Sequence, residues 1–133
     1  MTQISRRPLS KELEHRMFSL FRNALVNVRS EREAADLMDD LLSPMEKIML
    51  GKRLAIAFLL DRGYDQRTIH TVLHVSVTTV NSVNYWLQQK GDGYRRAVRL
   101  ARREQKWEKF FDGLELVLRG LLSEKEWVKT MRG

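Results

Sequence analysis

The residues best suited to making specific contacts lie in a short polar run between positions 76 and 85. Small hydroxyl and amide side chains alternate there with valines at helical spacing. Short side chains near a helix N-terminus let a backbone approach DNA closely, Asn can pair with an adenine edge, and Thr methyl groups can contact thymine. Ser76 is the expected N-cap of this helix. The side chains expected to face outward after it are Val77, Thr78, Thr79, Asn81, Ser82 and Tyr85.

The segment around this run has the spacing of a helix-turn-helix. Asp65 can cap a short helix from Gln66 to Leu73, and Ser76 can cap another from Val77 to about Gln89, which leaves a tight turn between them. The positions expected to be buried where the two helices cross are Ile69, Leu73, Val75, Val80 and Val83. A helical core with a polar exterior and no DNA contact is the alternative, because many tri-helical domains meet this spacing.

Two histidines depart from the usual motif. His70 stands where a small residue is common, and His74 stands where a glycine usually adopts the left-handed conformation. Their i, i+4 spacing could present two imidazoles to a metal ion, but Thr71 replaces the Glu of H-E-x-x-H and no third ligand accompanies them. We therefore expect no metal site and assign His70 to packing or phosphate contact.

A basic cluster follows the motif. On one predicted helix, cationic side chains repeat at three and four positions and form a stripe, made of Arg95, Arg99, Arg102, Lys106 and Lys109. The stripe predicts phosphate contacts, which would make binding weaken steeply with salt. A solvated helix face is the equal alternative, and a basic amphipathic helix on a membrane surface is a weaker third interpretation.

These residues require helices to position them, and the apolar pattern predicts an all-α fold. The chain has 7 Gly and 2 Pro, and its apolar residues recur at three and four positions rather than two. We predict one helix from Ser10 to about Val28 and a second from a capping box at Ser30 and Glu33 to about Leu42.

The strongest boundary is the triplet of N-cap, proline and capping-box glutamate formed by Ser43, Pro44 and Glu46. It predicts a helix to about Arg62, with Gly63 as its stop.

After the helix-turn-helix, a loop is predicted from Lys90 to Gly93. One long helix should then run from Tyr94 to about Leu118, with a break near Gly120 and a last helix from Ser123 to Met131.

Composition narrows the possible classes of function. The chain has 133 residues, 24 Lys and Arg against 17 Asp and Glu, a net charge of +7 and no cysteine. The absence of cysteine excludes disulfides and thiolate chemistry. The positive net charge favours an anionic partner. No apolar run reaches the length of a membrane span and no secretory signal is evident, so we expect a cytoplasmic protein. We find no nucleophile with a base, no paired catalytic carboxylates and no phosphate-binding glycine loop, and so expect no enzyme.

Between positions 42 and 83 the sequence resembles the tryptophan repressor family. The motifs that carry the resemblance are Leu42-Ser43-Pro44-Met45-Glu46, Leu50-Gly51-Lys52-Arg53, Arg62-Gly63 and Gln66-Arg67. The resemblance implies an intertwined homodimer that offers two helix-turn-helix heads to successive major grooves. It also implies that Gln66 and Arg67 touch phosphate or base and that the polar run from Val77 to Ser82 reads bases.

The resemblance extends only partly to the family's amino-acid pocket. Ser43 and Arg53 match two ligand positions, but Ser82 replaces the expected arginine and Val83 the adjoining glycine. The lost cation and the filled space argue against tryptophan as corepressor and leave the effector unknown.

These observations combine into one prediction. A repressor-like domain spans residues 1–90, with dimerisation helices at about 9–42, a core helix at 44–62 and the helix-turn-helix at 65–89, and a basic helical extension spans 91–133. The expected function is sequence-specific binding of double-stranded DNA by a homodimeric transcriptional regulator, a repressor. The alternative is a helical protein–protein interaction module that does not bind DNA.

Overall fold

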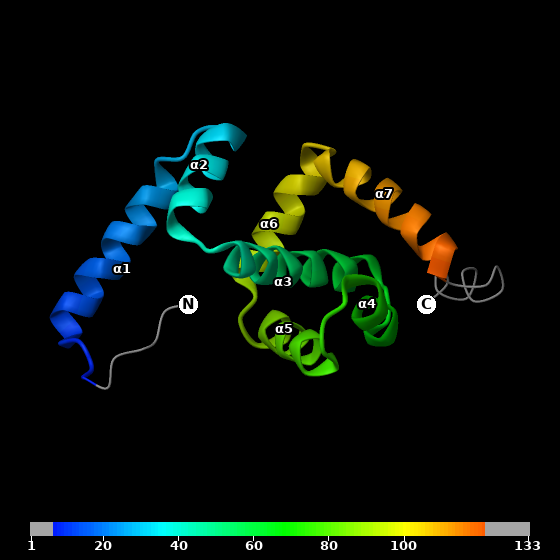
Figure 1. Ribbon diagram of the computed structural model, residues 1–133, viewed down its shortest axis with the longest axis horizontal. Helices are drawn as coiled ribbons and strands as arrows, with labels where there is room; N and C mark the ends of the chain where they lie inside the picture. The colour runs from blue at the N-terminus through cyan, green and yellow to red at the C-terminus, as the bar shows by residue number, and fades with distance from the viewer. Residues whose placement is uncertain (1–6, 122–133) are drawn as a thin grey trace. The chain divides into compact units, whose positions relative to one another are not determined.

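The computed structural model describes residues 7–121, and in that part of the chain it contains helices and no strand. The helices are α1 Lys11–Val26, α2 Glu31–Leu41, α3 Pro44–Arg62, α4 Gln66–Leu73, α5 Val77–Gln89, α6 Asp92–Arg103 and α7 Lys106–Leu121 (Figure 1). The predicted all-α fold is therefore confirmed. The predicted helix from Ser123 to Met131 lies outside the described residues.

The chain divides into two compact units that meet within α3, between Ile48 and Met49. The predicted boundary between two domains, at residue 90, does not coincide with this division and stays a prediction. In the first unit, Ser10 and Ser30 cap α1 and α2 as expected, since each hydroxyl accepts a hydrogen bond from the backbone N–H three residues later. α1 ends at Val26, slightly before the predicted end.

Helix α3 begins with the reciprocal capping box that its sequence predicts. The Ser43 N–H donates to the Glu46 carboxylate over 2.9 Å, and the Glu46 N–H donates to the Ser43 hydroxyl over 3.2 Å. The bond from the Ser43 N–H, and secondly the Ser43 hydroxyl beside the carboxylate, hold the pKa of the Glu46 carboxyl below its ordinary value. The start of α3 is thus fixed by local chemistry.

A Schellman motif ends α3 where Gly63 was expected to stop it. Gly63 has a positive φ of 96°, its N–H donates to the Leu60 carbonyl, and the Tyr64 N–H donates to the Leu59 carbonyl. Tyr64 and Leu59 are both buried in the core, so the turn also returns the chain to the apolar interior.

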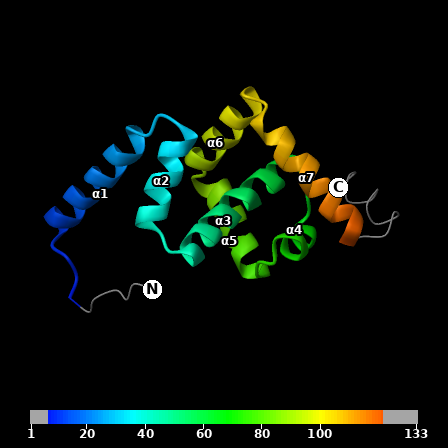
Figure 2. The same cartoon turned by 45° about the horizontal axis from the view of Figure 1, so that its top comes forward.

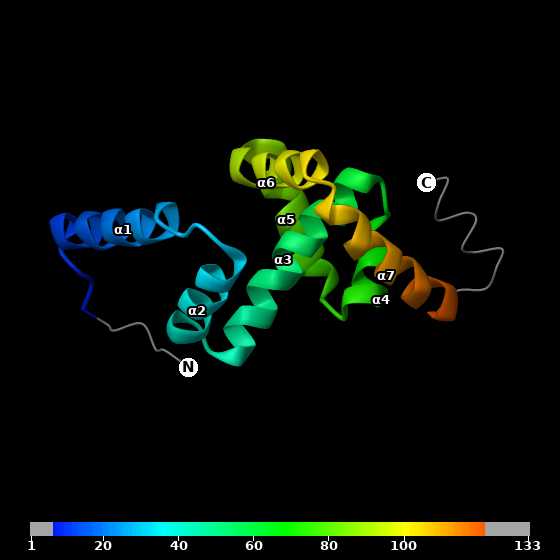
Figure 3. The same cartoon turned by 90° about the horizontal axis from the view of Figure 1, so that it is seen from above.

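In the second unit, α4 to α7 surround the C-terminal half of α3. α4 packs on α5 and α7, and α6 also packs on α5 and α7, which leaves α4 and α6 on opposite sides of α3 (Figure 2 and Figure 3). Their buried side chains form one cluster, made of Ile56, Ala57, Leu59, Tyr64, Ile69, Val72, Val80, Val83, Phe111, Leu114 and Leu118. The core therefore joins the helix-turn-helix to α7.

Beyond α5 the structure corrects the sequence prediction. α6 begins already at Asp92, and the expected single helix is two helices that meet at Glu104 and at Gln105, whose φ is 58°. The break near Gly120 does not occur, because α7 continues to Leu121. Phe111, Leu114 and Leu118 explain both differences: their burial requires the chain to turn after α6 and to stay helical past Leu118.

The loop after α5 is correspondingly short, and it depends on a glycine. Gly91 has a φ of 55°, and a Cβ atom added there would lie 2.6 Å from the Leu87 carbonyl oxygen. No other residue fits this position without a shift of the backbone, so Gly91 fixes the corner between α5 and α6.

Candidate nucleic-acid interface

Helix α4 begins at the N-cap that its sequence predicts. At its start, the Asp65 carboxylate accepts a hydrogen bond of 2.7 Å from the Thr68 N–H. Gln66 and Arg67 follow in the first turn, where Gln66 is half-buried and Arg67 exposed. Arg67 is therefore open to a ligand in the described chain.

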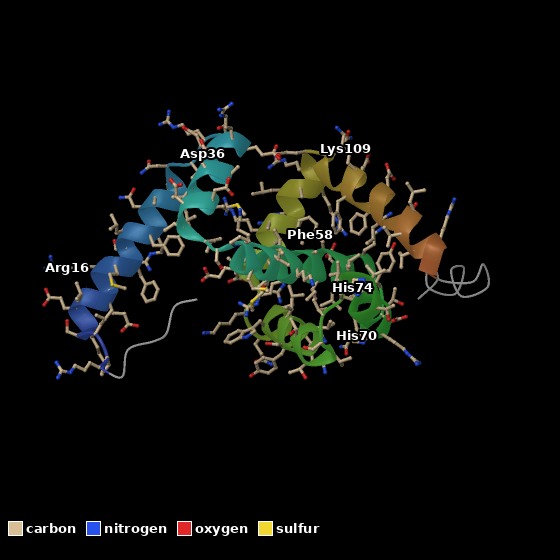
Figure 4. The ribbon with its side chains drawn as sticks, viewed as in Figure 1. Arg16, Asp36, Phe58, His70, His74 and Lys109 are labelled. Carbon is tan, nitrogen blue, oxygen red and sulfur yellow. The ribbon has the colours of Figure 1, made fainter. Side chains whose placement is uncertain are left out.

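The turn of the motif is built without glycine. His74 takes the left-handed conformation, with φ 53° and ψ 51°, as its position in the sequence predicted. The Lys52 ammonium of α3 donates to the His74 carbonyl over 3.1 Å, and the His70 ring bonds through Nδ1 to the Val75 carbonyl (Figure 4). His70 therefore contributes to the turn, and the carbonyl partner requires Nδ1 to carry a proton.

Helix α5 starts from a double contact at Ser76. The Ser76 hydroxyl accepts a hydrogen bond of 3.0 Å from the Thr79 N–H and lies 2.8 Å from the Thr79 hydroxyl. This second contact involves the Thr79 hydroxyl, which was predicted to contact DNA. Thr79 is accordingly half-buried, whereas Thr78 is exposed.

The two faces of α5 separate apolar and polar side chains. On the inner face, Val80 is completely buried and Val83 is 4% exposed. Five of the six residues predicted to face outward are exposed, namely Val77, Thr78, Asn81, Ser82 and Tyr85. Among the described residues of the second unit, therefore, no other helix covers the polar face of α5.

Burial within the motif largely follows the predicted spacing. Ile69 is completely buried, like Val80, but Leu73 and Val75 are half-buried and pack against the edge of the core. The sequence analysis missed Val72, which is buried and one turn beyond Ile69. The i, i+3 spacing of these two residues was the available signal.

Two of the three predicted effector-pocket residues lie together. Arg53 and Ser82 line a cleft of about 450 Å³, whose other lining residues are Thr78, Thr79, Val83, Trp86 and Tyr94. Ser43 instead caps α3. Trp86 and Tyr94, which the sequence analysis did not assign to this site, add two aromatic rings to its wall.

The predicted basic stripe is not continuous, because α6 ends at Arg103. Lys106 and Lys109 belong to α7, and Figure 4 shows Lys109 near the corner where α6 and α7 meet. Arg95 donates to the Lys90 and Leu87 carbonyls, and Arg102 pairs with Asp61 of α3. The stripe was predicted on one uninterrupted helix, and in this respect the prediction is wrong.

Comparison with known proteins identifies a family. The family model described as Trp repressor protein matches residues 16–104, which is more than half of the chain and includes the whole helix-turn-helix. No curated protein and no solved structure matches significantly. Among the described residues, no three His, Asp or Glu side chains are grouped as metal ligands, and no helix has the length and apolar character to cross a membrane.

Proposed function

Since this chain belongs to the Trp repressor protein family, we propose that it is a sequence-specific DNA-binding repressor of transcription that acts as a homodimer in the cytoplasm. The family is one of helix-turn-helix regulators rather than enzymes. The observation that carries the proposal is the polar N-terminal half of α5, which is capped by Ser76, seated on the core through Val80 and Val83, and exposed on its outer side.

The proposed contacts follow from side-chain chemistry. Asn81 is exposed near the helix N-terminus and can donate to and accept from an adenine edge, while the Thr78 methyl group can contact thymine. Arg67, Gln66 and the N-terminus of α4 can bind phosphates on the flanking backbone. In a dimer, two such heads would read half-sites about 34 Å apart.

Dimerisation is supported by apolar surface that the first unit does not bury by itself within its described residues. α1 and α2 contain no buried residue. Large side chains on α1 are exposed, among them Leu13, Met17, Phe18, Phe21 and Leu25. A soluble chain rarely leaves contiguous apolar surface of this kind open, and a second copy of the same helices would cover it symmetrically.

We further propose that tryptophan is not the effector. Ser82 supplies no cation to the cleft beside α5, and the Val83 side chain fills space where the family has glycine. Arg53 remains as the charged group among the described lining residues of the cleft, and an effector that fits beside the Val83 side chain would differ in shape from tryptophan.

The test is selection of bound duplexes from a random pool, followed by titration of the selected site at a stated salt concentration. Asn81→Ala should cost about 1–3 kcal/mol and relax the preference at one base pair. Gln89→Ala, an exposed amide at the other end of α5, is the matched control and should have little effect. If no sequence is enriched, the result contradicts sequence-specific DNA binding and favours the alternative of a protein–protein interaction module.

A further inference from the structure

A groove rich in arginine lies between α6 and the end of α3. Its volume is about 600 Å³, and it is lined by Asp61, Arg95, Val98, Arg99, Arg102 and Arg103. Four guanidinium groups thus face a single carboxylate. This volume lies within the range of about 300–1,000 Å³ that is typical of sites for small molecules.

The six residues have different roles in the groove. Arg102 pairs with Asp61, so the one carboxylate is already compensated. Arg95 is tied to backbone carbonyls at the end of α5. Arg99 and Arg103 make no hydrogen bond or ion pair with the described side chains, which leaves two guanidinium groups available for a ligand.

Arg99 and Arg103 are four residues apart, so they lie on one face of α6 with their Cβ atoms about 6 Å apart. Like charges at this spacing destabilise a helix unless an anion compensates them. Each guanidinium offers a planar fork of N–H donors that matches two oxygens of a phosphate. Two neighbouring forks therefore match two linked phosphate groups better than a single one.

The floor of the groove is apolar. Val98 is buried beneath the arginines, and the methylene stems of long side chains provide further apolar surface. A ligand with a carbon skeleton beside its phosphates would thus find both kinds of contact.

The groove shares no residue with the proposed DNA contacts, although α6 packs on α5. α6 lies across α3 from α4, whose first turn and neighbour α5 carry the proposed DNA contacts (Figure 1 and Figure 2). We propose that this groove binds a free organic compound that carries two linked phosphate groups. The site is distinct from the cleft beside α5, with which it shares no lining residue.

The proposal is tested by calorimetric titration of the full chain with inorganic pyrophosphate, and with inorganic phosphate for comparison, at fixed ionic strength. We expect saturable binding of pyrophosphate and binding of phosphate that is at least tenfold weaker. Arg99→Gln and Arg103→Gln should each weaken pyrophosphate binding at least tenfold. The matched control is Arg96→Gln, since Arg96 is exposed on α6 outside the groove and the substitution removes the same charge.

A further variant separates loss of the site from loss of the fold. Asp61→Asn releases Arg102 and removes the one negative charge among the described lining residues of the groove, so it should tighten pyrophosphate binding severalfold. Damage to the fold would weaken binding instead.

The proposal is overturned if pyrophosphate does not saturate, or if Arg96→Gln weakens its binding as much as Arg99→Gln does. It is also overturned if the groove substitutions weaken DNA binding alone, since the arginines would then be contacts to the DNA backbone.

Discussion

Replacing Leu118 with alanine tests whether α7 belongs to the same folded unit as the helix-turn-helix. Leu118 is 1% exposed and is among the largest completely buried side chains, in one cluster with Ile69 of α4 and Val80 of α5. Substitution of a buried leucine by alanine costs about 2–5 kcal/mol, because transfer free energy is lost and a cavity remains. We expect a loss of about 3 kcal/mol, a large part of the ~5–15 kcal/mol that stabilises a typical domain.

The assay is urea unfolding followed by circular dichroism, with Leu116→Ala as the control. Leu116 lies on the same helix and is 72% exposed, so the same change there should alter the free energy of unfolding by less than about 0.5 kcal/mol. Hydrogen exchange of the α4 amides should accelerate in Leu118→Ala and not in Leu116→Ala. Equal free energies of unfolding for the two variants would refute the packing of α7 on α4.

Four further predictions follow from other parts of the chain. His74→Gly should stabilise the protein by about 1 kcal/mol in thermal unfolding, because the left-handed conformation is costly for a residue with a side chain, whereas Thr71→Gly within α4 should destabilise it by about 0.3–0.5 kcal/mol. The Glu46 pKa lies below its ordinary value of 4.5, so its carboxylate stabilises the folded state above that pH and the contribution disappears as pH falls through the lowered pKa; unfolding curves of the wild type and Glu46→Gln should therefore converge in acid. Calorimetry with tryptophan should detect no binding, and saturable heat would show that Ser82 had been misjudged. Light scattering should give a dimer that Phe21→Glu disrupts, and a stable helical monomer of the wild type would contradict the proposed assembly.

The start of each helix up to α5 could be predicted because its determinants are local. Ser10, Ser30, Ser43, Asp65 and Ser76 each bond to a backbone N–H only three residues away. Such bonds are set by neighbouring residues and do not depend on the rest of the fold. The exposed face of α5 was predictable for the same reason, since the inward spacing of Val80 and Val83 fixes which side remains outside.

The region after α5 could not be predicted because its determinants are distant in sequence. Whether the helix continues past Gln105 depends on where Phe111 can be buried, and its ring is parallel to that of Tyr64 at a centroid distance of 6.4 Å. Similarly, helical spacing identifies Arg102 as part of a basic face, but not its pairing with Asp61, which lies 41 residues earlier. Periodicity describes a helix face and does not specify what will lie opposite it.

The inclusion of α7 in the core has a consequence for protein engineering. The family match ends at residue 104, so a chimera designed on family boundaries would transplant α4 and α5 into a relative without the helix that packs against them. Ile69 and Val72 would then face the host's own side chains, which have not been selected to complement them. To transfer the proposed DNA specificity to another scaffold, residues 49–121, which include the half of α3 that belongs to the same core, should be moved as one cassette.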